Sequence, residues 1–292
     1  MPAHDHSTGV SPPATRPDAA DFAGFAGHLA VAVAHLGEDG FPRAIDEAIR
    51  ALVPFDNSMV FAYAPGNPPI GVYTDLPTEA ETAIVIDKYI LGPYLLDPLY
   101  DEVQRGRKGG LAKLSAIAPD EFRKTEYYER HYLRTRITDE IGFFMGLPND
   151  VTAVLSITRR NGSAGFTPDD YARLSDAADL ITALGKRHWA DLYLRFADAD
   201  LAAGARGAAP LGPVEEMLRS LQRDTLSDRQ AEVIGYLLKG HSNTSISLHL
   251  GISAETVKVH RRNAYANLGI SSQAELFSIF IDHLSSRIQS RA

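Results

Sequence analysis

Three short helices, each with its own start and stop residues, are predicted close together in residues 226–268. Serine and asparagine caps satisfy the free N–H groups at the helix starts, and Gly251 supplies the left-handed turn that ends the second helix. The predicted helices are Asp228–Leu238 after Ser227, Thr244–Leu250 after Asn243, and Ala254–Leu268 after Ser253. Three capped helices in so short a segment leave few folds open, and a compact all-helical module is expected.

The third predicted helix has one apolar face and one basic face. Val257, Ala264 and Leu268 line up on the apolar face, and Glu255 in the first turn suits the positive end of the helix dipole. A charge run on an isolated helix is usually only a solvated face, but the ordered caps and the glycine turn favour a recognition helix. The side chains that could enter a major groove together are Thr256, Lys258, Val259, Arg261 and Arg262.

Three segments of this region resemble the LuxR-type helix-turn-helix family. They read LSDRQAEVI over 226–234, GHSNTSISLHLGISAETVKVHRRN over 240–263, and LGISSQAEL over 268–276. The resemblance implies a four-helix domain whose third helix enters the major groove of DNA. It also implies a fourth helix over Ser272–Leu284, of the kind that commonly mediates dimerisation.

The resemblance also implies roles for individual residues. By motif position, Lys258, Val259 and Arg262 would read bases or face the groove, and Thr256, Asn243 and Thr244 would lie near phosphates. The family usually has Glu where this chain has Gln230 and Ala where it has Ser247. The first departure replaces a bracing carboxylate by an amide, which can still form hydrogen bonds.

Charge is divided unevenly along the chain, whose formal net charge is -8. Residues 225–292 carry seven basic and five acidic side chains, so the excess of negative charge lies in residues 1–224. An acidic body repels DNA phosphates, so we expect DNA binding to depend on a local basic face and on dimerisation. Double-stranded DNA with an inverted-repeat operator is therefore the expected partner, contacted by a homodimer.

Composition sets the compartment that we expect. The chain has no cysteine, which excludes disulfides and thiolate metal sites and fits the cytoplasm. Residues 1–20 lack the positive start and apolar core of a secretory signal and are interpreted as a disordered tail. The apolar stretch Leu29–Leu36 is too short to span a membrane.

Two domains are expected from 292 residues. The Ala-, Gly- and Pro-rich run Ala197–Pro213 indicates a linker, which gives a sensor domain over 21–198, a linker over 199–224 and the DNA-binding domain over 225–292. Before the linker, Pro168–Phe196 reads as one long amphipathic helix capped by Thr167, which could support dimerisation.

The sensor domain is predicted to hold one antiparallel sheet flanked by helices. Helical patterns cover Phe41–Leu52, Thr78–Leu91 and Pro119–Thr135, and strand patterns cover Ser58–Ala64, Ile70–Tyr73, Ile141–Leu147 and Thr152–Thr158. The expected fold class is therefore α+β: an α/β/α domain similar to GAF- or PAS-like sensors, followed by the all-α module. Such sensors often enclose a small ligand.

The candidate ligand site centres on the stretch YILGPYLLDPLY over 89–100. It resembles a Tyr-then-Asp-Pro pattern in the autoinducer-binding domains of quorum-sensing LuxR proteins. The resemblance implies that Asp97 accepts a hydrogen bond from a ligand amide beside Tyr94. The tryptophans that usually accompany this pattern are missing, since Trp189 is the only tryptophan of the chain. Tyrosine rings with Asp97, Asp139 or Glu140 would favour an amine or another cation. The tentative ligand-binding residues are Asp97, Tyr94, Tyr89, Tyr100, Tyr128 and Tyr132.

Two other readings of this half remain open. The tyrosines could be core residues and Asp97 a helix cap, in which case the domain is a protein-interaction or dimerisation module without a ligand. An enzyme domain is the more distant alternative, because no nucleophile with a paired base and no phosphate-binding loop is found. No enzymatic activity, cofactor or metal is expected; the expected partners are DNA, a small-molecule effector, a second copy of the chain and RNA polymerase.

Overall fold

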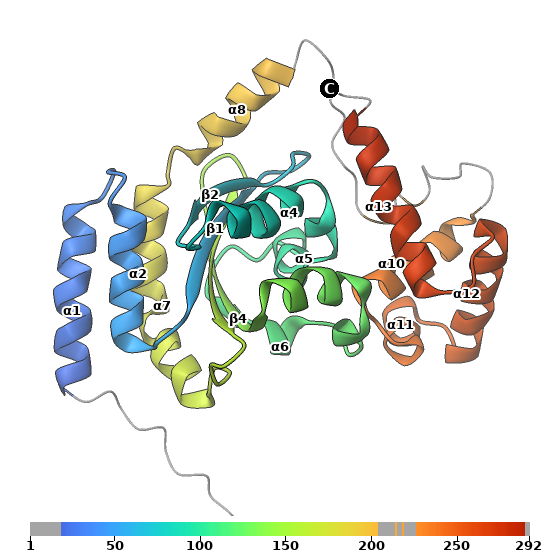
Figure 1. Cartoon of the computed structure of the whole chain (residues 1–292), viewed down its shortest axis with the longest axis horizontal. Helices are drawn as coiled ribbons and strands as arrows, with labels where there is room; N and C mark the ends of the chain where they lie inside the picture. Colours follow the sequence, from blue (N-terminus) through green and yellow to red (C-terminus); the bar gives the residue numbers. More distant parts are fainter. Residues whose placement is uncertain (1–18, 204–213, 215–217, 219–225, 290–292) are drawn as a thin grey trace, which may run out of the picture.

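The computed structural model describes residues 19–203, 214, 218 and 226–289. They form an α/β/α part and a separate group of four helices near the C-terminal end (Figure 1). The expected α+β fold class is confirmed. The predicted tail lies outside the described residues except for Ala19 and Ala20, which begin helix α1.

A five-stranded antiparallel sheet forms the centre of the first part. Its strand order is β2-β1-β5-β4-β3, and the turn-rich residues 65–69 join β1 to β2 as predicted. Strand β4 begins four residues earlier than predicted, and the short edge strand β3 was not predicted at all. The strands are β1 (Asn57–Tyr63), β2 (Ile70–Thr74), β3 (Leu111–Lys113), β4 (Ile137–Gly146) and β5 (Thr152–Arg160).

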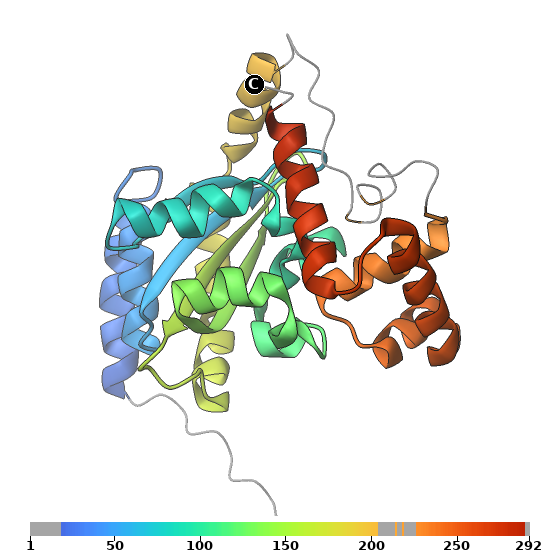
Figure 2. The ribbon, with the colours of Figure 1, turned by 45° about the vertical axis from the view of Figure 1, so that its right-hand side comes forward.

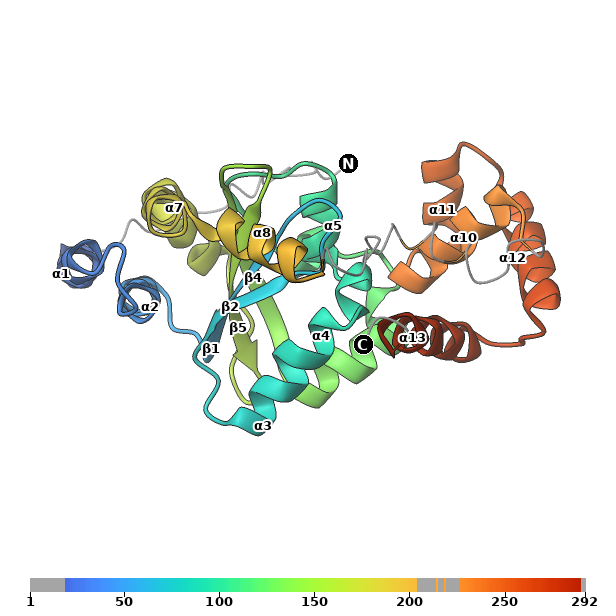
Figure 3. The same ribbon diagram turned by 90° about the horizontal axis from the view of Figure 1, so that it is seen from above.

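One face of the sheet is covered by α1 (Ala19–Ala34), α2 (Phe41–Leu52) and α7 (Pro168–His188). Figure 3 shows these three helices together on one side of the strands. The capping box that Thr167 forms with Asp170 explains the start of α7. The prediction of α2 agrees with the structure at both ends.

The predicted single helix over Pro168–Phe196 is wrong, because the helix breaks after His188 and resumes as α8 (Leu192–Ala203). Packing around Phe41 holds the break: the His188 ring stacks on Phe41 with centroids 4.2 Å apart, and Trp189 meets Phe41 edge-on at 5.7 Å. Tertiary contacts thus outweigh the helical pattern. Helix α8 also covers residues 199–203, the first residues of the predicted linker, most of which lies outside the described residues.

Short helical segments cover the opposite face of the sheet (Figure 3). The helical prediction for Thr78–Leu91 agrees with the structure, but residues 119–125 form only a 3-10 turn before a helix begins at Glu126. The segments are α3 (Glu79–Thr82), η1 (Ala83–Asp87), α4 (Lys88–Ile90), η2 (Pro93–Leu96), α5 (Pro98–Gln104), α6 (Leu114–Ile117), η3 (Phe122–Lys124) and η4 (Tyr128–Leu133).

The C-terminal module contains α10 (Asp228–Lys239), α11 (Asn243–Leu250), α12 (Ala254–Leu268) and α13 (Gln273–Gln289). Ser227 and Ser253 cap α10 and α12 as predicted, and Gly251 has the expected left-handed conformation. The cap of α11 was predicted one residue late, because Ser242, and not Asn243, accepts the hydrogen bond from the N–H of Ser245. Within the described ranges, no helix combines the length and apolar character that a membrane span requires.

Candidate nucleic-acid interface and ligand site

Helix α12 is fixed to the module by its apolar face. Val257 and Ala264 are fully buried against the neighbouring helices, which orients the opposite face outward. At its first turn the hydroxyl of Ser253 accepts a 3.0 Å hydrogen bond from the N–H of Thr256. Figure 1 shows α12 at the outer edge of the module, away from the sheet.

The outward face of α12 carries the predicted basic residues. Lys258, Val259 and Arg262 are exposed and Arg261 is half-buried, and all four line a groove of about 590 Å³. The Lys258 ammonium lies 3.1 Å from the carboxylate of Glu255, a weak surface pair that a phosphate could replace. The structure therefore brings these predicted residues together on one accessible face.

The predicted phosphate-contacting residues of α11 lie at its first turn. Thr244 is exposed, whereas Asn243 is half-buried with its side-chain Oδ1 buried and without a hydrogen-bond partner. Free N–H groups at a helix start attract anions. Thr256, at the start of α12, is half-buried and bonds to the Ser253 hydroxyl.

Gln230 occupies the position where the resemblance implies a bracing carboxylate. Its side-chain oxygen accepts a 3.0 Å hydrogen bond from the N–H of Ser227 and lies 3.4 Å from the Asn267 amide nitrogen. The amide therefore connects the start of α10 to the end of α12. Arg229 adds a bond of 2.6 Å to the carbonyl of Leu250.

Asp97 lies buried between the sheet and α5, with both carboxylate oxygens engaged. One accepts a 2.8 Å bond from the N–H of Leu99 and caps α5; the other accepts a 2.7 Å bond from the hydroxyl of Tyr89. A 2.7 Å hydrogen bond joins that hydroxyl to Tyr63. Burial raises the pKa of Asp97 to about 6. The structure thus places Asp97 both as a helix cap and as part of a tyrosine network.

The six predicted ligand residues form two groups. Tyr89, Tyr94 and Tyr100 surround Asp97, with Tyr94 meeting Tyr100 edge-on at 4.9 Å. Tyr128 and Tyr132 stack on each other 5.4 Å apart, and each meets Phe122 edge-on at 5.6 Å. His131, 5.6 Å from Tyr89 and 5.3 Å from Tyr132, connects the two groups within one core.

Sequence reasoning missed Tyr63 in this interior, whereas Glu140 and Asp139 were considered as ligand carboxylates. Tyr63 was not proposed, although its place in the alternating pattern of β1 turns it to the same face as Phe61. Glu140 accepts a 2.8 Å bond from Tyr132, and burial with the nearby charge of Asp97 raises its pKa to about 8. Asp139, considered beside it, instead pairs with Lys113 at 2.9 Å.

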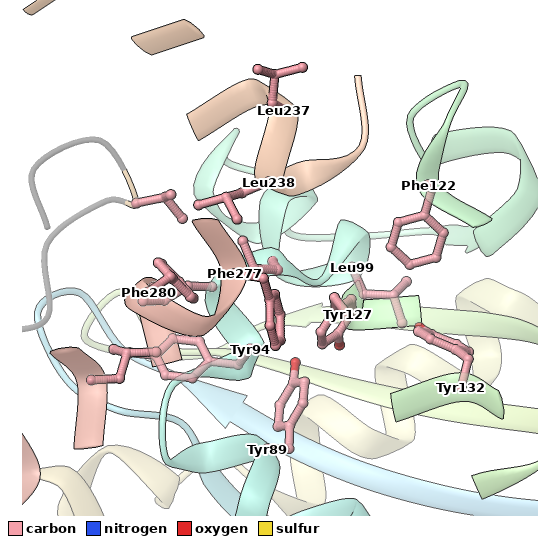
Figure 4. Close-up of a cluster of buried hydrophobic side chains, with 14 of the residues drawn as sticks. Tyr89, Tyr94, Leu99, Phe122, Tyr127, Tyr132, Leu237, Leu238, Phe277 and Phe280 are labelled. Carbon is pink, nitrogen blue, oxygen red and sulfur yellow. The ribbon is translucent and has the colours of Figure 1, made fainter. Parts of the chain in front are cut away.

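The C-terminal module docks on this aromatic side of the sheet. The carbonyl of Gly240 accepts a 2.9 Å hydrogen bond from the N–H of Glu121, and Asp120 accepts one of 2.9 Å from the N–H of Ser242. Lys239 pairs with Asp101 at 3.0 Å. Figure 4 shows the apolar part of the contact, where Leu238 of α10 and Phe277 and Phe280 of α13 lie beside Tyr89, Tyr94 and Tyr127.

A capped four-helix group with an exposed basic third helix defines a helix-turn-helix DNA-binding protein. Residues 224–280 match the family model for bacterial regulatory proteins of the luxR family. Residues 224–280 are therefore a luxR-type helix-turn-helix domain, as the sequence resemblance predicted. The domain boundaries and the residue assignments stay predictions.

Two relatives and one solved structure extend the similarity. The chain is 28% identical over 188 residues to an HTH-type transcriptional regulator in the exeN 3′ region of Aeromonas salmonicida, covering 64% of this chain and 94% of that protein. It is 37% identical over 135 residues to the transcriptional regulatory protein MctR of Rhizobium johnstonii, covering 46% and 56%. The LBD domain of VqsR from Pseudomonas aeruginosa matches with a TM-score of 0.50 and 26% identity, covering 56% of this chain and 95% of that domain.

Proposed function

We propose that the chain is a dimeric regulator that reads an inverted-repeat operator through α12 and whose DNA binding is controlled by a small molecule bound in residues 21–198. Residues 225–292 form the DNA-binding domain of this proposal. The observation that carries it is the docking of the module on the aromatic side of the sheet, with both parts sharing one buried core. A molecule that alters this core changes the position of α12.

Within the DNA-binding domain, each residue has a proposed task. Lys258, Val259 and Arg262 contact bases, because they lie on the exposed face of α12. A guanidinium such as that of Arg262 matches the two acceptors of guanine. The residues proposed to contact phosphates are Arg261, Thr256, Asn243 and Thr244.

In the sensor domain, Asp97 and the surrounding tyrosines are proposed to respond to the effector. Tyr89 connects Asp97 to the docked module, because it bonds to the carboxylate and lies in the shared core. The remaining tyrosines proposed for this response are Tyr94, Tyr100, Tyr128 and Tyr132.

Dimerisation is proposed to use the helical layer on the other face of the sheet. Three large apolar side chains stand exposed there: Val31 and Val33 on α1, and Leu180 on α7, each between 46% and 50% exposed. Burying them in a second copy would remove apolar surface from water. A two-fold dimer presents two recognition helices to half-sites about one DNA turn apart.

Selection of bound sequences from a random duplex pool tests this function. With the full-length protein we expect an inverted repeat whose half-site centres lie about 34–36 Å apart. The variant Lys258→Ala/Arg262→Ala should select no motif, whereas Lys108→Ala/Arg136→Ala, with the same loss of charge at exposed positions outside the dimer layer, should select the wild-type motif. Failure of the wild-type protein to enrich any sequence would contradict the proposal.

A further inference from the structure

A pocket of about 350 Å³ lies where the docked module meets the sensor domain. It opens between residues 88–93, the helix that follows Glu126, and α13. Its apolar walls come from both parts: Leu91 and Pro93 from the sensor, and Phe277, Ile281 and Leu284 from α13. This volume lies within the range of small-molecule sites in proteins.

Helix α13 lies close to the turn at Gly92 in the sensor domain. Gly92 has a φ of +134°, and a Cβ placed on it would come within 2.5 Å of the Leu284 side chain. The turn therefore adopts a backbone conformation that favours glycine, and it lies against the Leu284 side chain of α13. The two walls of the pocket are held together by direct packing.

The side chains around the pocket bring positive charge and no negative charge. Lys88, Arg130 and Arg134 line it, and no acidic residue does. Lys88 and Arg134 are exposed and have no ion-pair partner among the described residues, whereas Arg130 pairs with Glu126 and lies over the ring of Phe277. Three positively charged side chains thus surround this apolar pocket, although the chain has a net charge of -8. They favour an anion.

Two rings, those of Tyr127 and His131, form the inner surface of the pocket. The Tyr127 hydroxyl is buried beyond that surface, toward Asp97 and Glu140, and has no hydrogen-bond partner among the described residues. The ring of His131 stacks on Tyr127 5.4 Å away, and burial lowers the His131 pKa to about 4. The inner end of the pocket is therefore formed by two aromatic rings and carries no charge.

We propose that this pocket binds a small carboxylate with an apolar body, its charge held by Lys88 and Arg134 and its body by the walls from both parts. The ligand spans the contact between sensor and α13, so it stabilises the docked position of the DNA-binding module. The proposal rests on the proposed function, since it names the site and the chemical class of the effector. It replaces the cationic ligand expected from the tyrosines and Asp97, because Asp97 does not line this pocket.

Calorimetric titration of the full-length protein tests the ligand class. The probes are decanoate and naphthoate, each compared with the primary amine that carries the same apolar body. We expect at least one acid to bind about tenfold or more tightly than its amine. Hydrogen exchange across residues 273–284 should slow when that acid is present, because it holds α13 against the sensor.

Two variants of equal charge locate the site. Lys88→Gln/Arg134→Gln should weaken binding of the acid about tenfold or more, and Lys186→Gln/Arg187→Gln, which removes two exposed cations of α7, should leave it unchanged. The proposal is overturned if acids and amines bind alike, if no acid binds, or if both variants behave as the wild type. Sequence selection, run with and without the acid, tests the proposed function separately, because it measures DNA binding and not occupancy of the pocket.

Discussion

Arg262 is the residue on which the proposed sequence reading depends most. It is exposed near the centre of the basic face of α12, and a guanidinium that reads guanine typically contributes about 1–3 kcal/mol of discrimination. Arg262→Ala should therefore weaken binding to the selected site by about that amount and affect random DNA less, as measured by fluorescence anisotropy. Arg136→Ala, at an exposed arginine outside the dimer layer, is the control. An equal loss on both kinds of DNA would show that Arg262 contacts only the phosphate backbone.

Gly240 is constrained both by its left-handed backbone conformation and by its close contact with the sensor domain. Its φ is +96°, and an added Cβ would lie 2.6 Å from the Cα of Phe122 in the sensor. Gly251 is also left-handed, with a φ of +63°, but has open space around it. Both alanine variants carry a backbone penalty of about 1–2 kcal/mol, and only Gly240→Ala also forces the two parts of the protein apart.

Thermal unfolding of both glycine variants separates these effects. Gly240→Ala should lower the unfolding temperature more than Gly251→Ala, and hydrogen exchange at residues 119–125 should become faster only in Gly240→Ala. Equal behaviour of the two variants would mean that the contact between Gly240 and Phe122 contributes nothing to stability.

At the scale of elements, the DNA-binding module was the most predictable part of the chain. Its helix ends are set by local capping residues such as Ser227 and Ser253, so the sequence pattern alone locates them within a residue or two. The elements that were missed depend on distant contacts. Strand β3 pairs only with β4, and the break after His188 depends on Phe41, more than a hundred residues away.

The candidate site likewise combines features set by local sequence with features set by distant contacts. The basic face of α12 follows from helical spacing, and the structure places it as expected. The pocket beside α13 could not be predicted, because Lys88, Arg134 and Ile281 come together only through docking of the two parts. The alternative reading of Asp97 as a helix cap agrees with the structure, but its bond to Tyr89 joins two separate helical segments and was not predicted.

The layer of α1, α2 and α7 supports a prediction about assembly. Leu180 is 46% exposed on α7, so Leu180→Glu should leave the fold intact while placing a charge in the proposed dimer contact. Sedimentation should then show a shift from dimer towards monomer. Leu133→Glu, at a leucine that is 55% exposed elsewhere, should remain dimeric. An unchanged dimer in Leu180→Glu would place the contact on another surface.

At the scale of the whole molecule, buried titratable groups make stability depend on pH. The folded protein holds a proton on Glu140 up to about pH 8, whereas the unfolded chain releases it near 4.5, so the free energy of unfolding falls as pH rises between these values. His131 has the opposite effect below its ordinary value of 6.5, because burial opposes its protonation in the folded state. Between pH 6.5 and 8 only the first of these two effects operates.

Unfolding temperatures measured from pH 6.5 to 8 test this prediction. The wild-type protein should lose stability across the range, and Glu140→Gln should lose less, because it has no proton to release. Glu129→Gln, at an exposed glutamate, should follow the wild type. Parallel curves for Glu140→Gln and the wild type would show that Glu140 is already ionised at neutral pH.

The regulator as a whole is defined by its preference for one DNA sequence over others. The most direct measurement compares the dissociation constants of the full-length protein for its selected inverted repeat and for a scrambled duplex of the same length, at one physiological salt concentration. A luxR-type helix-turn-helix domain that reads bases through α12 should prefer the selected site by about a thousandfold or more. Equal affinity for the two duplexes would contradict sequence-specific recognition and leave only the attraction of a basic face for phosphates.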